Sequence, residues 1–308
     1  MTALSVLAVV VLGVIVAALV LRAHSAALVT EFARRLPVGG DGIIPGAQSI
    51  ALAGSPDHAV LLLHGFGDTP RTLEYLARAL ADVGYAVRVP LLPGHGRTID
   101  AFDNTRAKQW ITAAREAYAG LTTTHRSVSV MGLSMGGALG IILAADAPEL
   151  PALALVAPYV SMPRRARLVA RLHRGWQLFT PVFRSGGQRS IVDPAERARS
   201  LAYGLVTPRT LFELSRIVRR VQVSLPRIAA PTLVIHGVND ERVPPDAAAR
   251  EYARLGAREK ELVWAHEGGH VLTVDVGREH VIALVVGWIR RHAPLDATHE
   301  TRQGPRNG

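Results

Sequence analysis

Short runs rich in apolar residues recur between residues 59 and 264, and segments of helical composition separate them. Runs of this kind are typical of strands that are buried on both faces of a parallel sheet. We expect strands at 59–63, 86–90, 127–133, 152–157, 231–236 and 261–264, with a short first strand at 48–53. Helices are expected at 70–83, 108–121, 138–147 and 278–292. This alternation predicts an α/β protein with a mostly parallel sheet covered by helices on both faces.

One stretch, residues 159–208, interrupts the alternation and is too long for a simple crossover between two strands. We interpret it as an inserted cap over the carboxyl edge of the sheet, where ligands bind in such folds. Within it, five arginines at 164, 165, 167, 171 and 174 surround Leu168, Val169 and Leu172, which predicts a short basic amphipathic helix. Such a helix either rests on lipid headgroups or packs its apolar stripe on the domain and leaves the arginines in water.

The amino-terminal stretch Ala3–Leu21 is uncharged and almost wholly aliphatic. As a helix it would be about 28 Å long, close to the ~30 Å hydrocarbon core of a bilayer. We interpret it as a single membrane-spanning anchor rather than a cleaved secretion signal, because no basic residue precedes it and the run is long. Arg22, Arg34 and Arg35 follow it, so the positive-inside tendency predicts that the domain after it is cytoplasmic.

These features divide the chain into four parts. We expect a transmembrane anchor at 1–24, a linker at 25–56 that is rich in Gly and Pro from residue 38, an α/β domain at 57–292 and a disordered polar tail at 293–308. The chain of 308 residues is long enough for one large domain with an insertion.

The amino-acid composition excludes several kinds of catalytic and binding site. The chain has no cysteine, which excludes disulfides, thiolate catalysis and cysteine-ligated zinc. Its formal net charge is +10, and almost all of its basic residues are arginines. The charge fits either attraction to an anionic lipid surface or a solvated surface shaped by codon bias. No recognition-helix pattern or aromatic-interleaved basic motif points to nucleic acid, and no metal-ligand spacing, phosphate loop or dinucleotide fingerprint points to a cofactor.

Ser134 lies at the junction of the expected strand 127–133 and a helix, within Gly132-Leu-Ser-Met-Gly136. A Gly-x-Ser-x-Gly sequence between a strand and a helix predicts a sharp turn that projects the serine hydroxyl beyond the sheet edge. The alternative is a glycine-rich turn with an idle serine. The helix amino terminus behind the serine would favour developing negative charge.

A serine nucleophile needs an imidazole base and a carboxylate that orients it. Asp240 follows the expected strand 231–236, and His270 follows the strand that ends near Trp264. The rivals for the acid are Glu241, Asp246 and Asp193, and the rival for the base is His266. We predict Ser134, Asp240 and His270 as a catalytic triad.

Two backbone N–H groups are expected to bind the oxyanion of a tetrahedral intermediate. Met135 directly follows the nucleophile, and Phe66 lies in the loop after the strand 59–63 and would also offer an apolar wall. His64 and His95 lie nearby, and we expect them to hold loops by hydrogen bonds.

Five motifs together resemble the bacterial α/β-hydrolase carboxylesterases of the monoacylglycerol lipase type. They are His64-Gly-Phe-Gly-Asp, Pro93-Gly-His-Gly, Gly132-Leu-Ser-Met-Gly-Gly, Gly237-Val-Asn-Asp and Gly269-His-Val-Leu-Thr-Val-Asp275. The resemblance covers residues 59–292 and implies the α/β-hydrolase fold with a small cap, the same triad, and oxyanion donors at Phe66 and Met135. The apolar amino terminus and the arginine-rich cap depart from the soluble members.

We therefore expect a membrane-anchored serine esterase that cleaves monoacylglycerols or simple acyl esters through an acyl-enzyme, without a metal or cofactor. A thioesterase or carbon–carbon bond hydrolase on the same triad is the alternative, and a non-catalytic binding module is a third. Ser134 at the turn excludes the epoxide and haloalkane hydrolases, which need a carboxylate there.

Overall fold

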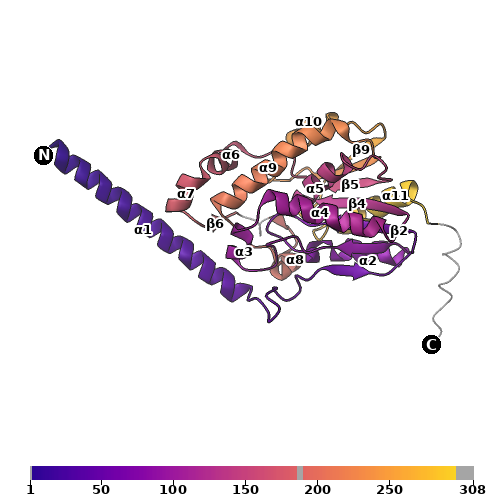
Figure 1. Ribbon diagram of the computed structural model, residues 1–308, viewed down its shortest axis with the longest axis horizontal. Coiled ribbons are helices and arrows are strands. Elements are labelled where there is room, and N and C mark those ends of the chain that lie inside the picture. Colours follow the sequence, from indigo (N-terminus) through magenta and orange to yellow (C-terminus); the bar gives the residue numbers. More distant parts are fainter. Residues whose placement is uncertain (1, 186–189, 296–308) are drawn as a thin grey trace.

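A seven-stranded sheet forms the centre of the protein (Figure 1). The computed structural model describes residues 2–185 and 190–295. The strand order is β1-β3-β2-β4-β5-β8-β9, and every neighbouring pair is parallel except β1 with β3. The bounds are Ile50–Leu52 for β1, His58–Leu63 for β2, Ala86–Val89 for β3, Ser127–Leu133 for β4, Leu153–Val156 for β5, Thr232–Gly237 for β8 and Lys260–Ala265 for β9. The predicted α/β-hydrolase fold with its mostly parallel sheet is confirmed.

The sheet carries helices on both faces because alternate strand residues point to opposite sides. In β2, Leu61 and Leu63 join one core and Val60 and Leu62 join the other. The first core receives α4 (Ala107–Thr122), α5 (Met135–Ala144) and α9 (Pro208–Ser224), and the second receives α2 (Glu74–Asp82) and α11 (Arg278–His292). The remaining short elements are η1 (Pro70–Leu73), α3 (Ile99–Asp103), η3 (Leu225–Arg227) and α10 (Pro245–Ala253).

The segment between β5 and α9 lies over the carboxyl edge of the sheet as a small cap. It contains α6 (Arg164–Arg171), α7 (His173–Phe179), β6 (Phe183–Arg184), α8 (Pro194–Arg199) and β7 (Leu205–Val206). β6 and β7 pair antiparallel with Phe183 opposite Val206. The cap returns to the core through α9, a 17-residue helix that the sequence interpretation did not include.

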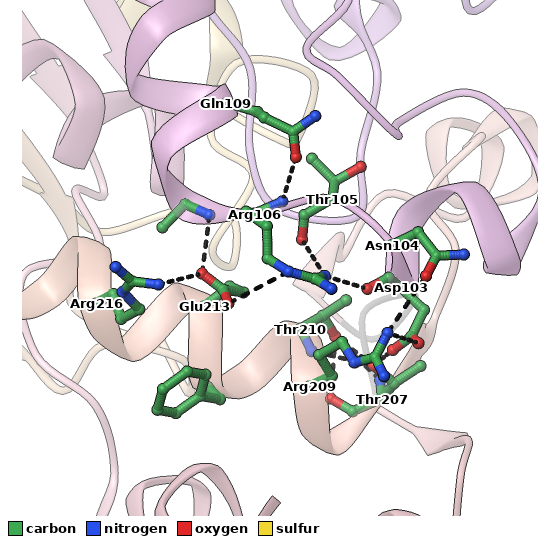
Figure 2. A network of polar contacts seen from close by, with 12 residues as sticks. Asp103, Asn104, Thr105, Arg106, Gln109, Thr207, Arg209, Thr210, Glu213 and Arg216 are labelled. Atoms are coloured by element: carbon green, nitrogen blue, oxygen red, sulfur yellow. Dashed lines mark hydrogen bonds and ion pairs between the residues drawn. The ribbon is translucent and has the colours of Figure 1, made fainter.

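A polar network fixes the start of α9 to α3 and α4 (Figure 2). The buried carboxylate of Glu213 accepts the backbone N–H of Ala107 at 3.0 Å and is 3.5 Å from Arg216. The hydroxyl of Thr207 donates to Asp103, and Arg209 forms an ion pair with the same carboxylate at 3.3 Å. These contacts hold the exit of the cap against the domain.

The amino-terminal helix α1 runs from Ala3 to Arg35 without a break and projects from the domain (Figure 1). Within residues 2–185 and 190–295 it is the one helix that is long and apolar enough to cross a membrane. A membrane span and a secretion signal both fit such a helix.

The linker predicted from residue 25 begins only after Arg35, because the last third of α1 packs on the domain. Ser25, Leu28 and Phe32 are buried there, and the ring of Phe32 lies edge-on to Tyr203 at 4.9 Å. Apolar contact with the domain therefore keeps this part of the predicted linker helical. The predicted disordered tail lies almost wholly outside the described residues, which end at residue 295.

Candidate active site

Ser134 occupies a strained turn between β4 and α5. Its φ of 53° and ψ of −114° lie in a region that non-glycine residues rarely adopt. Two glycines make the turn possible: a Cβ on Gly132 would lie 2.3 Å from the Gly136 carbonyl oxygen, and one on Gly136 would lie 1.9 Å from the Leu63 carbonyl oxygen. The backbone of three segments therefore closes around the serine, and its hydroxyl projects into a cavity.

His270 and Asp240 reach Ser134 from the loops after β9 and β8. The Nε2 atom of His270 lies 2.8 Å from the Ser134 hydroxyl, and its Nδ1 atom lies 2.7 Å from Asp240 Oδ2. A carboxylate only accepts, so Nδ1–H donates to Asp240 and Nε2 is left to accept the serine proton. Ser134 and His270 are 8% exposed and Asp240 is 4% exposed, so solvent competes little with these bonds.

The environment of Asp240 keeps its carboxylate ionised. Burial by itself would raise the pKa of Asp240, but the hydrogen bond and charge of His270 outweigh burial, and the net pKa is lowered. The second oxygen, Oδ1, accepts the backbone N–H groups of Arg242 at 2.7 Å and Val243 at 3.0 Å. The loop itself therefore orients the carboxylate toward the imidazole.

The rival acids and the rival base lie elsewhere or bind other groups. Asp246 is exposed on α10 and pairs with Arg250 at 2.5 Å, and Asp193 accepts backbone N–H groups at the start of α8. His266 is exposed on the surface. Glu241 lines the cavity, although His270 is hydrogen-bonded to Asp240 instead. The structure thus brings together the three residues that the sequence singled out.

The two predicted oxyanion donors flank Ser134. Met135 is the first residue of α5, and the loop of Phe66 runs close by, since a Cβ on Gly65 would lie 3.5 Å from the Ser134 Cβ. No hydrogen bond occupies the amide N–H of Met135 or of Phe66 within the described part of the chain. The ring of Phe66 lines the cavity and packs on Phe102 at 4.9 Å.

His64 and His95 hold loops, as expected. His64 Nε2 accepts the Leu92 N–H at 3.0 Å, its Nδ1 donates to the Gly65 carbonyl at 2.9 Å, and burial lowers its pKa to about 4. A neutral imidazole is therefore kept at neutral pH, bridging the loops that follow β2 and β3. His95 lies beside it with ring centroids 5.1 Å apart.

A cavity of about 670 Å³ extends from Ser134 and His270 into the cap. Its walls are mainly apolar and include Phe66, Val169, Phe183, Leu205, Val206, Leu211 and Leu214. Arg165, Arg184, Glu241 and Arg242 supply charged groups to its lining. This combination suits a ligand with a long apolar portion and one reactive polar group. No cluster of three or more His, Asp or Glu side chains that could hold a metal occurs in residues 2–185 and 190–295.

The sequence interpretation assigned no role to Asp275, which the structure places behind His270. Its fully buried carboxylate accepts four backbone N–H groups at 2.7–2.9 Å, from Gly269 and Val276 and from Val192 and Asp193 in the cap. The Ser190 carbonyl in turn accepts the N–H of His270 at 2.9 Å. Asp275 therefore connects the histidine loop to the cap, and its position five residues after His270 was the signal available in the sequence.

The family model described as serine aminopeptidase, S33, matches residues 54–277. The chain belongs to this family of α/β-hydrolases. It is 29% identical over 251 residues to a thermostable monoacylglycerol lipase of Bacillus sp. strain H-257, covering 82% of this chain and 97% of the relative. It is 27% identical over 227 residues to a carboxylesterase of Bacillus subtilis strain 168, covering 73% and 89%.

A solved structure supports the same assignment. It comes from work on LipS and LipT, two metagenome-derived lipolytic enzymes. Its sequence is 28% identical to this chain, the TM-score is 0.70, and the match covers 81% of this chain and 100% of the solved chain. The family and these relatives make the protein an ester-cleaving serine hydrolase of the lipase and esterase type.

Proposed function

We propose that the protein hydrolyses monoacylglycerols or simple acyl esters with Ser134, His270 and Asp240 as a catalytic triad. The hydrogen-bonded chain from Ser134 Oγ through His270 to Asp240 Oδ2, with bonds of 2.8 and 2.7 Å, is the observation that carries the proposal. Its place at one end of a largely apolar cavity supports an acyl substrate. The catalytic unit runs from residue 57 to 292 and includes the cap.

In the first half of the proposed reaction, Ser134 Oγ attacks the ester carbonyl carbon while His270 Nε2 takes the hydroxyl proton. The amide N–H groups of Phe66 and Met135 bind the oxyanion of the tetrahedral intermediate. His270 then gives its proton to the leaving alcohol oxygen as the C–O bond breaks, and the acyl group stays on Ser134.

In the second half, a water molecule gives a proton to His270 as its oxygen attacks the acyl carbon. The new intermediate collapses, the proton returns to Ser134 Oγ, and the carboxylic acid leaves. Asp240 remains ionised throughout and stabilises the imidazolium that forms twice, consistent with its lowered pKa.

We also propose that α1 anchors the enzyme in a membrane as a single span with the catalytic domain on the cytoplasmic face. The exposed apolar first part of α1 and the basic residues that follow it support this orientation. Protease added to sealed vesicles of known orientation tests it: the domain should be digested only where the cytoplasmic face is outward.

Fluorophosphonate labelling and a substrate panel test the chemistry. We expect the probe to label the wild-type chain and not Ser134→Ala, which distinguishes an enzyme from a binding module. The panel contains p-nitrophenyl esters, acyl-CoA thioesters, monoacylglycerols and a carbon–carbon hydrolase substrate. Faster turnover of the thioesters or of the carbon–carbon substrate than of every oxygen ester would overturn the proposed substrate class.

A further inference from the structure

From Arg22 onward, α1 is joined to the cap by polar contacts. Arg22 donates to the Leu178 carbonyl at 3.0 Å, the buried hydroxyl of Ser25 donates to the Val182 carbonyl at 2.8 Å, and Glu31 forms an ion pair with Arg184 at 2.7 Å. The partner residues lie in α7, in β6 and in the connection between them. Because α1 is one continuous helix, its free first part and the cap are held in a defined orientation.

The cap has an unpartnered apolar face next to this contact. Leu168, Leu172, Trp176, Leu178 and Phe179 are 38–64% exposed, and we call these five residues the outer cap face. Leu172, Trp176 and Phe179 line one shallow groove, so they lie together. Monomeric soluble proteins rarely expose several large apolar side chains side by side, and such patches mark interaction sites.

The charges around the outer cap face indicate what covers it. Five arginines lie on α6 and α7; Arg165 lines the cavity, and the other four are at 164, 167, 171 and 174. No Asp or Glu occurs between residues 159 and 192. Exposed leucines, a tryptophan and arginines on one short helical segment are the composition of helices that lie in a membrane interface. An anionic phospholipid surface offers both the apolar and the negatively charged partner.

The position of α1 determines where the bilayer surface lies relative to the cap. Residues Ala3–Leu21 make about 28 Å of helix, which matches the hydrocarbon thickness and leaves Arg22 at the interface. Arg22 bonds the backbone of Leu178, so α7 lies at the same depth. Figure 1 shows the free part of α1 leaving the domain beside α7.

We propose that the outer cap face inserts into the headgroup region of the anionic bilayer that α1 spans. The helix α6 then separates bilayer from cavity: Ala166 and Val169 line the cavity, while Leu168 on another face of the helix is exposed. A single-chain acyl ester in that leaflet would enter the cavity without crossing bulk water. This last step rests on the proposed function, whereas the docking itself does not.

Tryptophan fluorescence measures the docking directly. The full-length chain is reconstituted in vesicles of phosphatidylcholine and phosphatidylglycerol whose acyl chains carry bromine near the headgroup or near the methyl end. Trp176 is 40% exposed, Trp110 and Trp288 are buried, and the fourth tryptophan, Trp264, is half-buried on β9. We expect bromine near the headgroup to quench the tryptophan fluorescence more strongly than bromine near the methyl end. The variant Trp176→Phe should lose most of this quenching.

Equal quenching of the wild type and Trp176→Phe would overturn the proposal. Absence of quenching together with a cross-linked dimer would also overturn it and would assign the face to a second copy of the chain. Cleavage of the chain before residue 25 in its native host would remove the span and overturn it as well.

A pair of activity measurements separates docking from catalysis. The double variant Leu172→Ser, Leu178→Ser changes two exposed side chains, and Val223→Ser, exposed at the end of α9, is the matched control. We expect the double variant to hydrolyse a monoacylglycerol in vesicles at least about tenfold more slowly, with p-nitrophenyl acetate turnover unchanged. If the double variant and Val223→Ser hydrolyse the monoacylglycerol in vesicles at equal rates, the docking proposal is wrong. If the wild type turns over neither the monoacylglycerol nor p-nitrophenyl acetate, the proposed function alone is wrong.

Discussion

The carboxylate of Asp275 accepts the backbone N–H of Gly269 at 2.7 Å, one residue before the proposed catalytic base. The same carboxylate accepts two N–H groups from the cap, at Val192 and Asp193. One buried side chain therefore positions the histidine loop and one end of the cap together. A displacement of either segment is transmitted to the other through these bonds.

Replacing Asp275 with Asn should lower ester turnover, although this side chain does not line the cavity. The amide NH₂ would face backbone donors that now bind a carboxylate, and at least one buried N–H would lose its partner. A shift of the imidazole of about 1 Å would cost roughly a hundredfold in kcat. The measurement is ester turnover, and Asp246→Asn, a change to an exposed carboxylate, is the control. Equal kcat values in the two variants would contradict a positioning role.

Removing Ser134 or His270 should abolish most of the turnover. We expect Ser134→Ala and His270→Ala each to lower kcat by about 10⁴ to 10⁶, and the double variant to be no worse, because the residues act as one unit. His266→Ala, which changes the exposed rival histidine, should retain wild-type kcat. Loss of activity in His266→Ala with activity retained in His270→Ala would reassign the base.

The turn at Ser134 should not tolerate a methyl group at Gly136. A Cβ there would lie 1.9 Å from the Leu63 carbonyl oxygen, so β2 and α5 would have to separate. We expect Gly136→Ala to destabilise the protein by about 3 kcal/mol or more. Gly120 in α4 has no atom within 4 Å of the corresponding position, and Gly120→Ala should stabilise by about 0.5–1 kcal/mol. Thermal unfolding of the detergent-solubilised chain measures both, and equal melting temperatures would contradict this account.

Asp68 should make stability fall as the pH rises. Burial raises the pKa of Asp68 to about 7, although bonds to Thr69 and Thr72 oppose the rise. In the unfolded chain the carboxyl ionises near pH 4, so between about pH 4 and pH 7 the unfolded state loses the proton first and is favoured. The effect is at most on the order of 4 kcal/mol. Asp68→Asn should lack it, so the wild type should lose more stability than the variant between these pH values. Parallel stability curves would contradict the prediction.

Local patterns were sufficient for many of the elements. The strand predicted at 127–133 and the helix predicted at 278–292 agree with β4 and α11 residue for residue, because an apolar run before a glycine turn and an amphipathic segment carry their own signals. The helix α9 was not predicted, although Leu214, Ile217 and Val221 recur at helical spacing. Its many arginines and its place after the irregular cap hid that pattern.

The amino-terminal helix shows where sequence reasoning stops. Its apolar composition predicts a membrane-spanning length, but nothing local indicates that Ser25, Leu28 and Phe32 are buried against the cap. The same limit applies to the exposed leucines of α6 and α7, since only packing decides which face of a short helix is covered. The docking proposal depends on both facts.

By itself, the sequence determined the class of sheet and the strained serine turn, because each follows from residues that are neighbours in the chain. It also determined the order of serine, acid and histidine, because each of these residues follows a recognisable apolar strand. Only the tertiary structure decided that β4, β8 and β9 end at one edge, so that Ser134, Asp240 and His270 come within hydrogen-bond distance. It also decided that Asp275 joins the cap to the histidine loop. The Ser134–His270 contact joins residues 136 positions apart and the Val192–Asp275 contact joins residues 83 apart. Such contacts depend on strand order and packing, which no local pattern encodes.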